Sequence, residues 1–349
     1  MTIRFLTTDG LAQWLAKVSE TRRVLAPRKE GKSVVFRQWK AGDPEPVLAK
    51  ATIAPKAAVF PPCETLVQYK SVKDAEDLSK TNLTLEAPTQ AEPTLLFACR
   101  PCDARGILAL DTPYLNGRFK DPYYAARRAA TVVVSHTCDT PSPTCFCTWV
   151  GAGPANPEGS DVLMTSVDGG FVLEAVSENG EALLAESGLP DGADKMDQAR
   201  ATRTNAAKRI TARKDLSKAP ERLKARFTDM AFWIEQTAKC LSCGACTFMC
   251  PTCQCFTITD EGEAASEKGG QRLRSWDYCM SPMFTREASG HNPRMAKAER
   301  MRNRVSHKYW YATEYTKDHH FSCTGCGRCI VQCPVSLDIR EIVLKAIEE

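Results

Sequence analysis

The sequence predicts an α+β fold, in which an N-terminal α/β domain precedes a C-terminal domain built around a repeated cysteine motif. Three observations indicate this. Strand and helix patterns alternate up to about residue 190, a basic helix-forming stretch follows, and one twelve-residue cysteine pattern then occurs twice. The predicted parts are an α/β domain at 1–190, a helical linker at 191–235, and a cysteine-motif domain at 236–349 with an insert at about 256–320.

The N-terminal part has the elements expected of an α/β domain. An amphipathic pattern from Leu11 to Val18 predicts a short helix. Two strands flanking Asp168 and Gly169 predict a hairpin. Apolar runs predict the other strands, because a strand covered on both faces is apolar throughout. These strands are expected at 34–36, 58–60, 94–98 and 131–134.

The repeated motif reads C-x2-C-x2-C-x3-C-P, at 240–251 and again at 323–334. In bacterial-type ferredoxins, the first three cysteines of such a run bind one 4Fe-4S cluster and the fourth binds the other cluster. Zinc sites usually pair two C-x2-4-C elements instead, and this spacing is not typical of disulfides either. The motif therefore predicts a ferredoxin-like domain with two 4Fe-4S clusters. The expected ligands are Cys240, Cys243, Cys246 and Cys333 for cluster 1, and Cys323, Cys326, Cys329 and Cys250 for cluster 2.

A second group of cysteines follows two predicted strands of the N-terminal domain. Cys99 and Cys102 follow one strand, and Cys138, Cys145 and Cys147 follow the next. The carboxyl ends of neighbouring parallel strands meet at one crevice. Four of these thiols could therefore hold a third 4Fe-4S cluster. The expected set is Cys99, Cys102, Cys138 and either Cys145 or Cys147. A zinc site, a redox-active thiol pair and buried cysteines without a metal remain alternatives.

Four cysteines have no assigned role: Cys63, Cys253, Cys255 and Cys279. Cys253 and Cys255 directly follow a predicted ligand turn. They are expected to line the pocket of the first cluster or to tune it through S–H contacts, with additional ligation as the alternative.

Charge is distributed unevenly along the chain, whose net charge is +4. Residues 129–194 contain no Lys or Arg, whereas 195–226 contain eleven, and a second basic stretch covers 272–308. Such stretches can form solvated helix faces and supply counter-charge for anionic clusters. Alternatively, they can bind an acidic partner protein, a membrane surface or nucleic acid. Because no nucleic-acid-reading module and no apolar run of ~18 residues is present, we expect neither a nucleic-acid partner nor a membrane span. Cysteine-rich metal sites without a signal-peptide pattern predict a reducing cytoplasm.

Several short segments resemble a known family. They are Arg100–Ile107, Cys145–Thr148, Cys250–Phe256, Arg274–Asp277, Gly290–Arg294 and the second cysteine motif. The family comprises the iron-sulfur beta-type subunits of cytoplasmic redox complexes. It includes an iron-sulfur subunit of anaerobic sulfite reductase, the beta subunit of sulfhydrogenase, and 4Fe-4S dicluster subunits associated with flavin oxidoreductase and heterodisulfide reductase. The resembling segments cover residues 99–339, so they extend well beyond the two cysteine turns.

The resemblance implies an electron-transfer subunit used in anaerobic metabolism. Such a subunit relays single electrons between a flavin-containing, NAD(P)H-linked or ferredoxin-linked subunit and a catalytic subunit of hydrogenase, sulfite reductase or heterodisulfide reductase type. No G-x-G-x-x-G motif follows a predicted strand, so hydride chemistry is expected from the partner and no catalytic residue is assigned. The alternative is a catalytic subunit that reduces a thiol, disulfide or sulfur compound at the N-terminal cysteine crevice.

Overall fold

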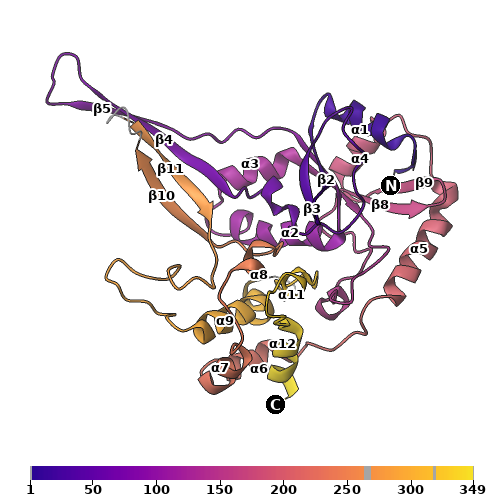
Figure 1. The fold of residues 1–349 in the computed structure, drawn as a ribbon. Helices are drawn as coiled ribbons and strands as arrows, with labels where there is room; N and C mark the ends of the chain where they lie inside the picture. Colours follow the sequence, from indigo (N-terminus) through magenta and orange to yellow (C-terminus); the bar gives the residue numbers. More distant parts are fainter. Residues whose placement is uncertain (1, 263–268, 317–319, 349) are drawn as a thin grey trace.

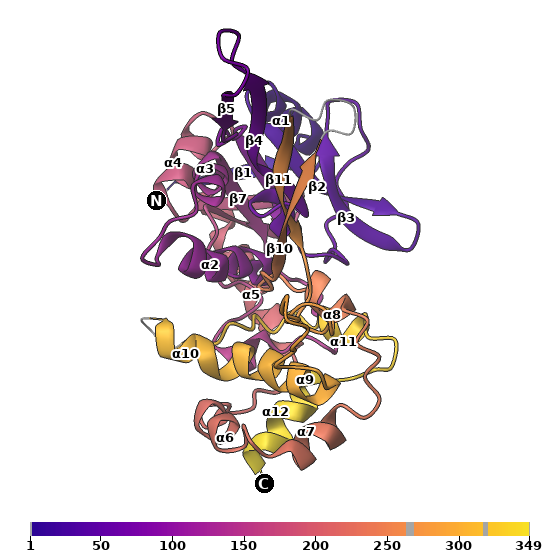
Figure 2. The same ribbon diagram turned by 90° about the vertical axis from the view of Figure 1, so that its left-hand side faces the viewer.

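The computed structural model describes residues 2–262, 269–316 and 320–348, and it has the predicted α+β fold (Figure 1). A seven-stranded sheet with helices on both faces forms the N-terminal part, and a four-stranded sheet projects from it. Helices form the C-terminal part. Figure 2 shows the α/β part and the helical part at opposite ends of the molecule, with the short helices α8 and α11 between them.

The seven-stranded sheet has the order β1-β9-β8-β7-β6-β2-β3. β2, β6, β7 and β8 run parallel, whereas β1, β9 and β3 are antiparallel to their neighbours. β6 and β7 are buried along their whole length, as expected for central parallel strands. The strands are β1 (Ile3–Thr7), β2 (Arg23–Glu30), β3 (Ser33–Trp39), β6 (Thr94–Cys99), β7 (Thr131–His136), β8 (Val162–Val167) and β9 (Gly170–Ala175).

Helices cover both faces of this sheet. Leu15 and Leu184, from the helices of one face, pack with Phe97 of β6. Ile107, from the other face, packs with Leu96. Successive residues of a strand point to opposite faces, so β6 contributes to both apolar cores. The covering helices are α1 (Leu11–Ser19) and α4 (Glu178–Ala185) on the first face, and α2 (Pro101–Leu115) and α3 (Pro122–Ala130) on the second.

The predicted helix at 11–18, the strands at 34–36, 94–98 and 131–134, and the hairpin are confirmed. The strand predicted at 58–60 is wrong. Residues Pro55–Ala58 instead form a 3-10 helix, η1, and Val59 and Phe60 pack in the core against α2. Proline favours the first turn of a helix, and Pro61 and Pro62 lack the N–H groups that a ladder needs. The next strand therefore begins only at Cys63.

The four-stranded sheet combines strands from both halves of the chain. Its order is β10-β11-β4-β5, and all of its pairs are antiparallel. β4 (Cys63–Lys73) and β5 (Thr81–Glu86) precede the cysteine motifs, whereas β10 (Phe256–Gly262) and β11 (Gly269–Trp276) belong to the predicted insert. Arg274 of β11 is buried and forms ion pairs with Glu64 of β4 (2.6 Å) and with Asp121. The insert therefore begins as an ordered extension of the N-terminal part.

The remaining helices surround a core that includes Trp233, Tyr309 and Val343. Three separate helices, α5, α6 and α7, lie in the region predicted as a helical linker and its flanks. No helix among the described residues is long and apolar enough to cross a bilayer. The elements are η2 (Cys147–Val150), η3 (Ala193–Lys195), α5 (Met196–Lys208), α6 (Ala219–Ala225), α7 (Met230–Gln236), α8 (Ala245–Phe248), α9 (Lys297–Ser306), the π-helical turn η4 (His307–Tyr311), α10 (Ala312–Tyr315), α11 (Arg328–Val331) and α12 (Ile339–Glu348).

Candidate functional site

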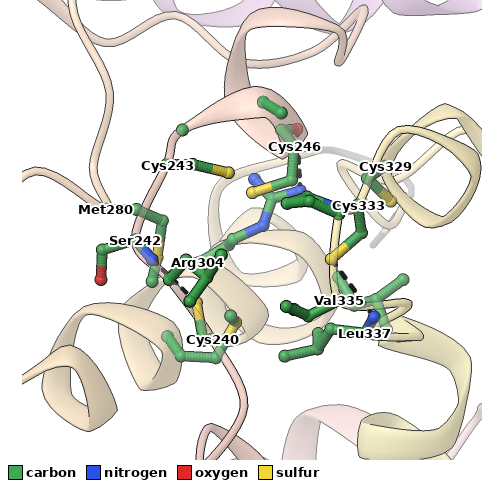
Figure 3. Close-up of a pocket in the computed structure, with 16 residues that line it drawn as sticks. Cys240, Ser242, Cys243, Cys246, Met280, Arg304, Cys329, Cys333, Val335 and Leu337 are labelled. Atoms are coloured by element: carbon green, nitrogen blue, oxygen red, sulfur yellow. Dashed lines mark hydrogen bonds between the residues drawn. The ribbon is translucent and has the colours of Figure 1, made fainter.

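The first cysteine turn and the end of the second turn enclose an apolar cavity. Met301 and Leu337 form part of its wall. Five cysteines line this space, three from the first motif and two from the second (Figure 3). Cys240, Cys243, Cys246 and Cys333 are the expected ligands of cluster 1, and the fifth, Cys329, is an expected ligand of cluster 2.

The expected ligands of cluster 2 form a second group. Burial raises the pKa of the Cys323, Cys326 and Cys329 thiols, and the nearby Cys250 raises each of them further. The fourth cysteine of the first motif therefore lies with the first three cysteines of the second motif. A cluster reverses this cost of ionisation, because bound iron stabilises the thiolate form.

Two glycines allow this interleaved arrangement. Gly244 and Gly327 stand directly before α8 and α11 with φ of 78° and 72°, a conformation that glycine adopts without strain. A β-carbon on Gly244 would lie 2.6 Å from the ring of Tyr278. The two short helices pack against each other and carry the fourth cysteine of each motif away from the first three.

Backbone N–H groups point at the cysteine sulfurs in both turns. Such N–H···S contacts stabilise an anionic cluster and help to set its potential. The donors and acceptors are Ser242 N and Cys240 Sγ (3.4 Å), Gly325 N and Cys323 Sγ (3.4 Å), and Leu337 N and Cys333 Sγ (3.2 Å). The residues present therefore fit two 4Fe-4S clusters, each held by cysteines of both turns.

The second turn sits directly on the N-terminal cysteine loop. The Phe146 N–H donates to the Gly325 carbonyl (2.8 Å). Gly325 has a φ of 65°, and a β-carbon there would lie 2.5 Å from the backbone of Cys147. Lys50 joins the same two loops, since its Nζ donates to Cys145 Sγ (3.4 Å) and to the Cys326 carbonyl (3.1 Å).

Four of the five N-terminal cysteines lie near one another. β6 and β7 are adjacent and parallel, as the crevice prediction required. Burial raises the pKa of the Cys102, Cys138 and Cys147 thiols, and nearby cysteines raise each of them further. Cys102 has Cys138 and Cys326 as neighbours, and Cys138 has Cys145 as a neighbour. This group therefore adjoins the cluster 2 cysteines.

Cys99 lies apart from this group. It is fully buried and packs with Ala104 and Ile107 in the core under α2. Its Sγ lies 3.9 Å from the Val134 carbonyl. A register irregularity and a positive φ at Ala98 turn the end of β6, so that the Cys99 side chain enters the core. Sequence spacing cannot show which face of a strand end a cysteine takes.

Within 2–262, 269–316 and 320–348, no three His, Cys, Asp or Glu side chains are close enough together to hold one metal ion.

Two buried cations accompany the cysteine turns. Arg304 and Lys308 are 4% and 5% exposed, and within the described part of the chain no Asp or Glu forms an ion pair with either. Arg304 donates to the Cys246 carbonyl (3.0 Å) and to Cys253 Sγ (3.5 Å). Buried charges need a counter-charge. Anionic clusters at the two cysteine turns would supply the counter-charge for Arg304 and Lys308. Arg272 and Arg274, in the same basic stretch of the sequence, instead pair with carboxylates.

Another ion pair joins the second cysteine helix to the N-terminal domain. Arg328 of α11 donates to both carboxylate oxygens of Asp103 on α2, at 2.5 and 3.0 Å. Both side chains are almost fully buried. The sequence does not predict this pair, although Asp103 directly follows the candidate ligand Cys102 and Arg328 directly precedes the candidate ligand Cys329.

The other cysteines occupy two places. Cys63 is exposed on β4, 3.3 Å from the Ser275 hydroxyl. Cys253, Cys255 and Cys279 line a larger cavity beside the cysteine turns.

Comparison with known proteins gives two matches. Residues 239–337 match the family described as the 4Fe-4S dicluster domain. The chain is also 28% identical over 338 residues to the protein named sulfhydrogenase 2 subunit beta of Pyrococcus furiosus, covering 95% of each chain. No solved structure matches the chain. Both matches confirm the resemblance to iron-sulfur beta-type subunits.

Proposed function

Because the chain carries a 4Fe-4S dicluster domain and is similar over nearly its whole length to an iron-sulfur beta-type subunit, we propose that it is an electron-transfer subunit of a multisubunit oxidoreductase. The observation that carries this proposal is the interleaving of the two cysteine turns through α8 and α11. A 4Fe-4S cluster supplies reversible one-electron chemistry when bound. The chain would hold two of them side by side.

The protein supplies ligands, charge and insulation at these sites. Cys240, Cys243, Cys246 and Cys333 would hold cluster 1, and Cys323, Cys326, Cys329 and Cys250 would hold cluster 2. Arg304 and Lys308 offset the negative charge, and the apolar walls exclude water. Cys243 is exposed and Leu241 is 65% exposed, so the first turn reaches the surface. A redox partner would dock there.

We further propose a third 4Fe-4S cluster, held by Cys102, Cys138, Cys145 and Cys147. The adjacency of this group to Cys326 supports it, because a relay needs its stations close together. Cys99 is left out of the set because its thiol packs in the apolar core. The third station extends the path from the surface turn into the N-terminal domain.

The partners are proposed from the same resemblance. One is a flavin-containing, NAD(P)H-linked or ferredoxin-linked subunit, and the other is a catalytic redox subunit of hydrogenase, sulfite reductase or heterodisulfide reductase type. All seventeen cysteines are free thiols, which suits the reducing conditions of a cytoplasm.

The N-terminal cysteines are poor candidates for the alternative role, direct attack on a sulfur substrate. The attacking species is a thiolate. Burial raises the pKa of Cys147 to about 12, and it also raises the pKa of Cys102 well above its usual range. Neither side chain favours the thiolate unless iron binds it.

Partner dependence tests the proposal. The anaerobically purified chain alone is expected to be reduced and reoxidised reversibly, without turning over the electron acceptor of its catalytic partner subunit. Adding the flavin and catalytic subunits should restore turnover. Iron-dependent turnover by the isolated chain, lost in Cys147→Ser with both dicluster EPR signals intact, would instead support a catalytic crevice.

A further inference from the structure

A large cavity lies beside the two cysteine turns. Its volume is about 1190 Å³, and three cysteines without an assigned role, Cys253, Cys255 and Cys279, form part of its wall. The described residues of the wall include five Arg or Lys and one acidic residue, Glu158, which pairs with Arg105 (3.1 Å). Because Arg304 and Lys308 would be offset by the proposed clusters, Lys120 and Arg294 supply the positive charge that suits an anionic ligand.

The base of the β10–β11 hairpin holds two of these cysteines together. Phe256 pairs with Trp276 at the end of the ladder, and the Asp277 N–H donates to the Cys255 carbonyl (2.9 Å). The thiols of Cys255 and Cys279 are neighbours in the wall of this cavity. This contact lowers the pKa of Cys279 to about 5 and raises the pKa of Cys255. A thiolate in contact with a thiol is the reduced form of a redox-active pair.

The pair also lies close to proposed ligands of both clusters. The Thr247 hydroxyl is 3.8 Å from Cys279 Sγ and 4.0 Å from Cys246 Sγ. On the other side, Cys253 is a neighbour of Cys250. One side chain therefore separates Cys279 from a proposed ligand of cluster 1, and Cys253 lines the same cavity against a proposed ligand of cluster 2.

We propose that Cys255 and Cys279 form a redox-active dithiol that reduces a small anionic disulfide bound in the basic cavity. This inference rests on the proposed clusters as the source of electrons. The Cys279 thiolate attacks one sulfur of the bound disulfide, whose S–S bond breaks, and the first product thiol leaves. Cys255 then attacks the Cys279 sulfur of the mixed disulfide, which releases the second thiol and forms the Cys255–Cys279 bond.

The chain returns to its starting state by reduction of that bond. Two electrons, which the proposed clusters would supply one at a time, and two protons would reopen the Cys255–Cys279 disulfide. In sum, one disulfide, two electrons and two protons give two thiols. The cavity wall supplies positive charge for the anionic substrate. Arg294 is a wall residue whose backbone, rather than its guanidinium, makes the hydrogen bonds to Asn292 and Arg300.

Peptide mapping tests the dithiol directly. The anaerobic holoprotein is treated with oxidised glutathione, a small anionic disulfide, its free thiols are alkylated, and it is digested with trypsin. Cys279 is the single cysteine of the tryptic segment 275–286, and fragment-ion masses of the linked peptide distinguish Cys255 from the other five cysteines of the segment 240–268. We expect a Cys255–Cys279 link in the wild type and in Cys63→Ser, the matched control at an exposed cysteine. The link should be absent in Cys255→Ser and Cys279→Ser, and disappear when reduced viologen is added.

Turnover provides the second readout. Viologen-driven reduction of oxidised glutathione should fall at least roughly tenfold in both dithiol variants, with cluster EPR signals intact. Arg294→Gln should slow the reduction of oxidised glutathione but not the reduction of cystamine, a cationic disulfide. The inference is overturned if no link forms in a wild type that shows both EPR signals. It is also overturned if Cys279→Ser loses about four iron per chain, because the thiol would then be a ligand. Absence of iron from the wild type would instead refute the proposed function.

Discussion

Arg328 and Asp103 form a doubly hydrogen-bonded ion pair in a place from which water is almost fully excluded. Arg328 also donates to the Ala51 carbonyl (2.8 Å), and the Arg100 N–H donates to the Asp103 carboxylate (3.2 Å). The pair fixes α11, which follows the cluster 2 turn, against the start of α2 in the N-terminal domain. The relative placement of cluster 2 and the N-terminal cysteines depends on it.

Removing one member of this pair should destabilise the protein strongly. Arg328→Met leaves the Asp103 carboxylate buried without a counter-charge, which typically costs about 3–5 kcal/mol. Urea unfolding of the anaerobic holoprotein, followed by tryptophan fluorescence, measures the loss. Arg272→Gln is the matched control, because its pair with Asp260 is about half exposed and solvent screens it, so its loss should be much smaller. Equal losses in the two variants would contradict this account.

Cross-ligation gives a sharp prediction for Cys250. If the ligands interleave, Cys250→Ala disrupts the same cluster as Cys323→Ala, although the two cysteines belong to different motifs. EPR spectra of the reduced variants should then show the same surviving signal, and iron should fall by about four per chain in each. A Cys250→Ala spectrum that matches Cys243→Ala instead would mean that each motif holds its own cluster.

The contact between the second turn and the N-terminal loop predicts the effect of a methyl group. Gly325→Ala places a β-carbon 2.5 Å from the Cys147 backbone and strains a positive φ. We expect a loss of about 2–4 kcal/mol in unfolding free energy, of which about 1 kcal/mol comes from the backbone conformation. Gly151→Ala is the control, because its φ is also positive but nothing lies within 4 Å. Gly151→Ala should therefore show only the loss of about 1 kcal/mol that comes from the backbone conformation.

The buried Arg304 should raise the reduction potential of the cluster for which Cys246 is a proposed ligand. Arg304→Leu removes a positive charge whose guanidinium bonds the Cys246 carbonyl, so the added electron is less well stabilised. The potential should become more negative by on the order of 60 mV, a tenfold change in a one-electron equilibrium. An EPR-monitored redox titration measures this. Arg302→Leu on the same helix should leave the potential unchanged, because Arg302 contacts Phe227 instead. An unchanged potential in Arg304→Leu would contradict the role.

Local sequence signals predicted most of the fold. The apolar runs at 94–98 and 131–134 and the hairpin around Asp168 are determined by short-range pattern, and the structure has them. The run at 58–60 has the same apolar character, but the prolines around it prevent ladder bonds and tertiary packing makes it a turn. The pairing of β4 with β11 joins residues some two hundred positions apart, and no local pattern contains it.

The candidate site was predictable to the extent that spacing determines it. The eight cysteines of the two motifs follow from the repeated pattern, since tight turns fix their neighbours. Cys99 and Cys102 are three residues apart, yet one thiol enters the core and the other faces Cys138 and Cys326. The contact between Cys255 and Cys279 depends on the register of the hairpin between them, and Arg328 depends on docking between domains. Such long-range contacts require the folded chain.

The electron capacity of the anaerobic holoprotein tests the central claim most directly. A reductive titration counts the electrons taken up per chain, with iron and acid-labile sulfide measured on the same sample. Two clusters predict about two electrons and about eight iron, and the proposed third cluster raises these to about three and about twelve. Fewer than about one electron per chain, or a metal other than iron at the cysteine turns, would contradict an electron-transfer role.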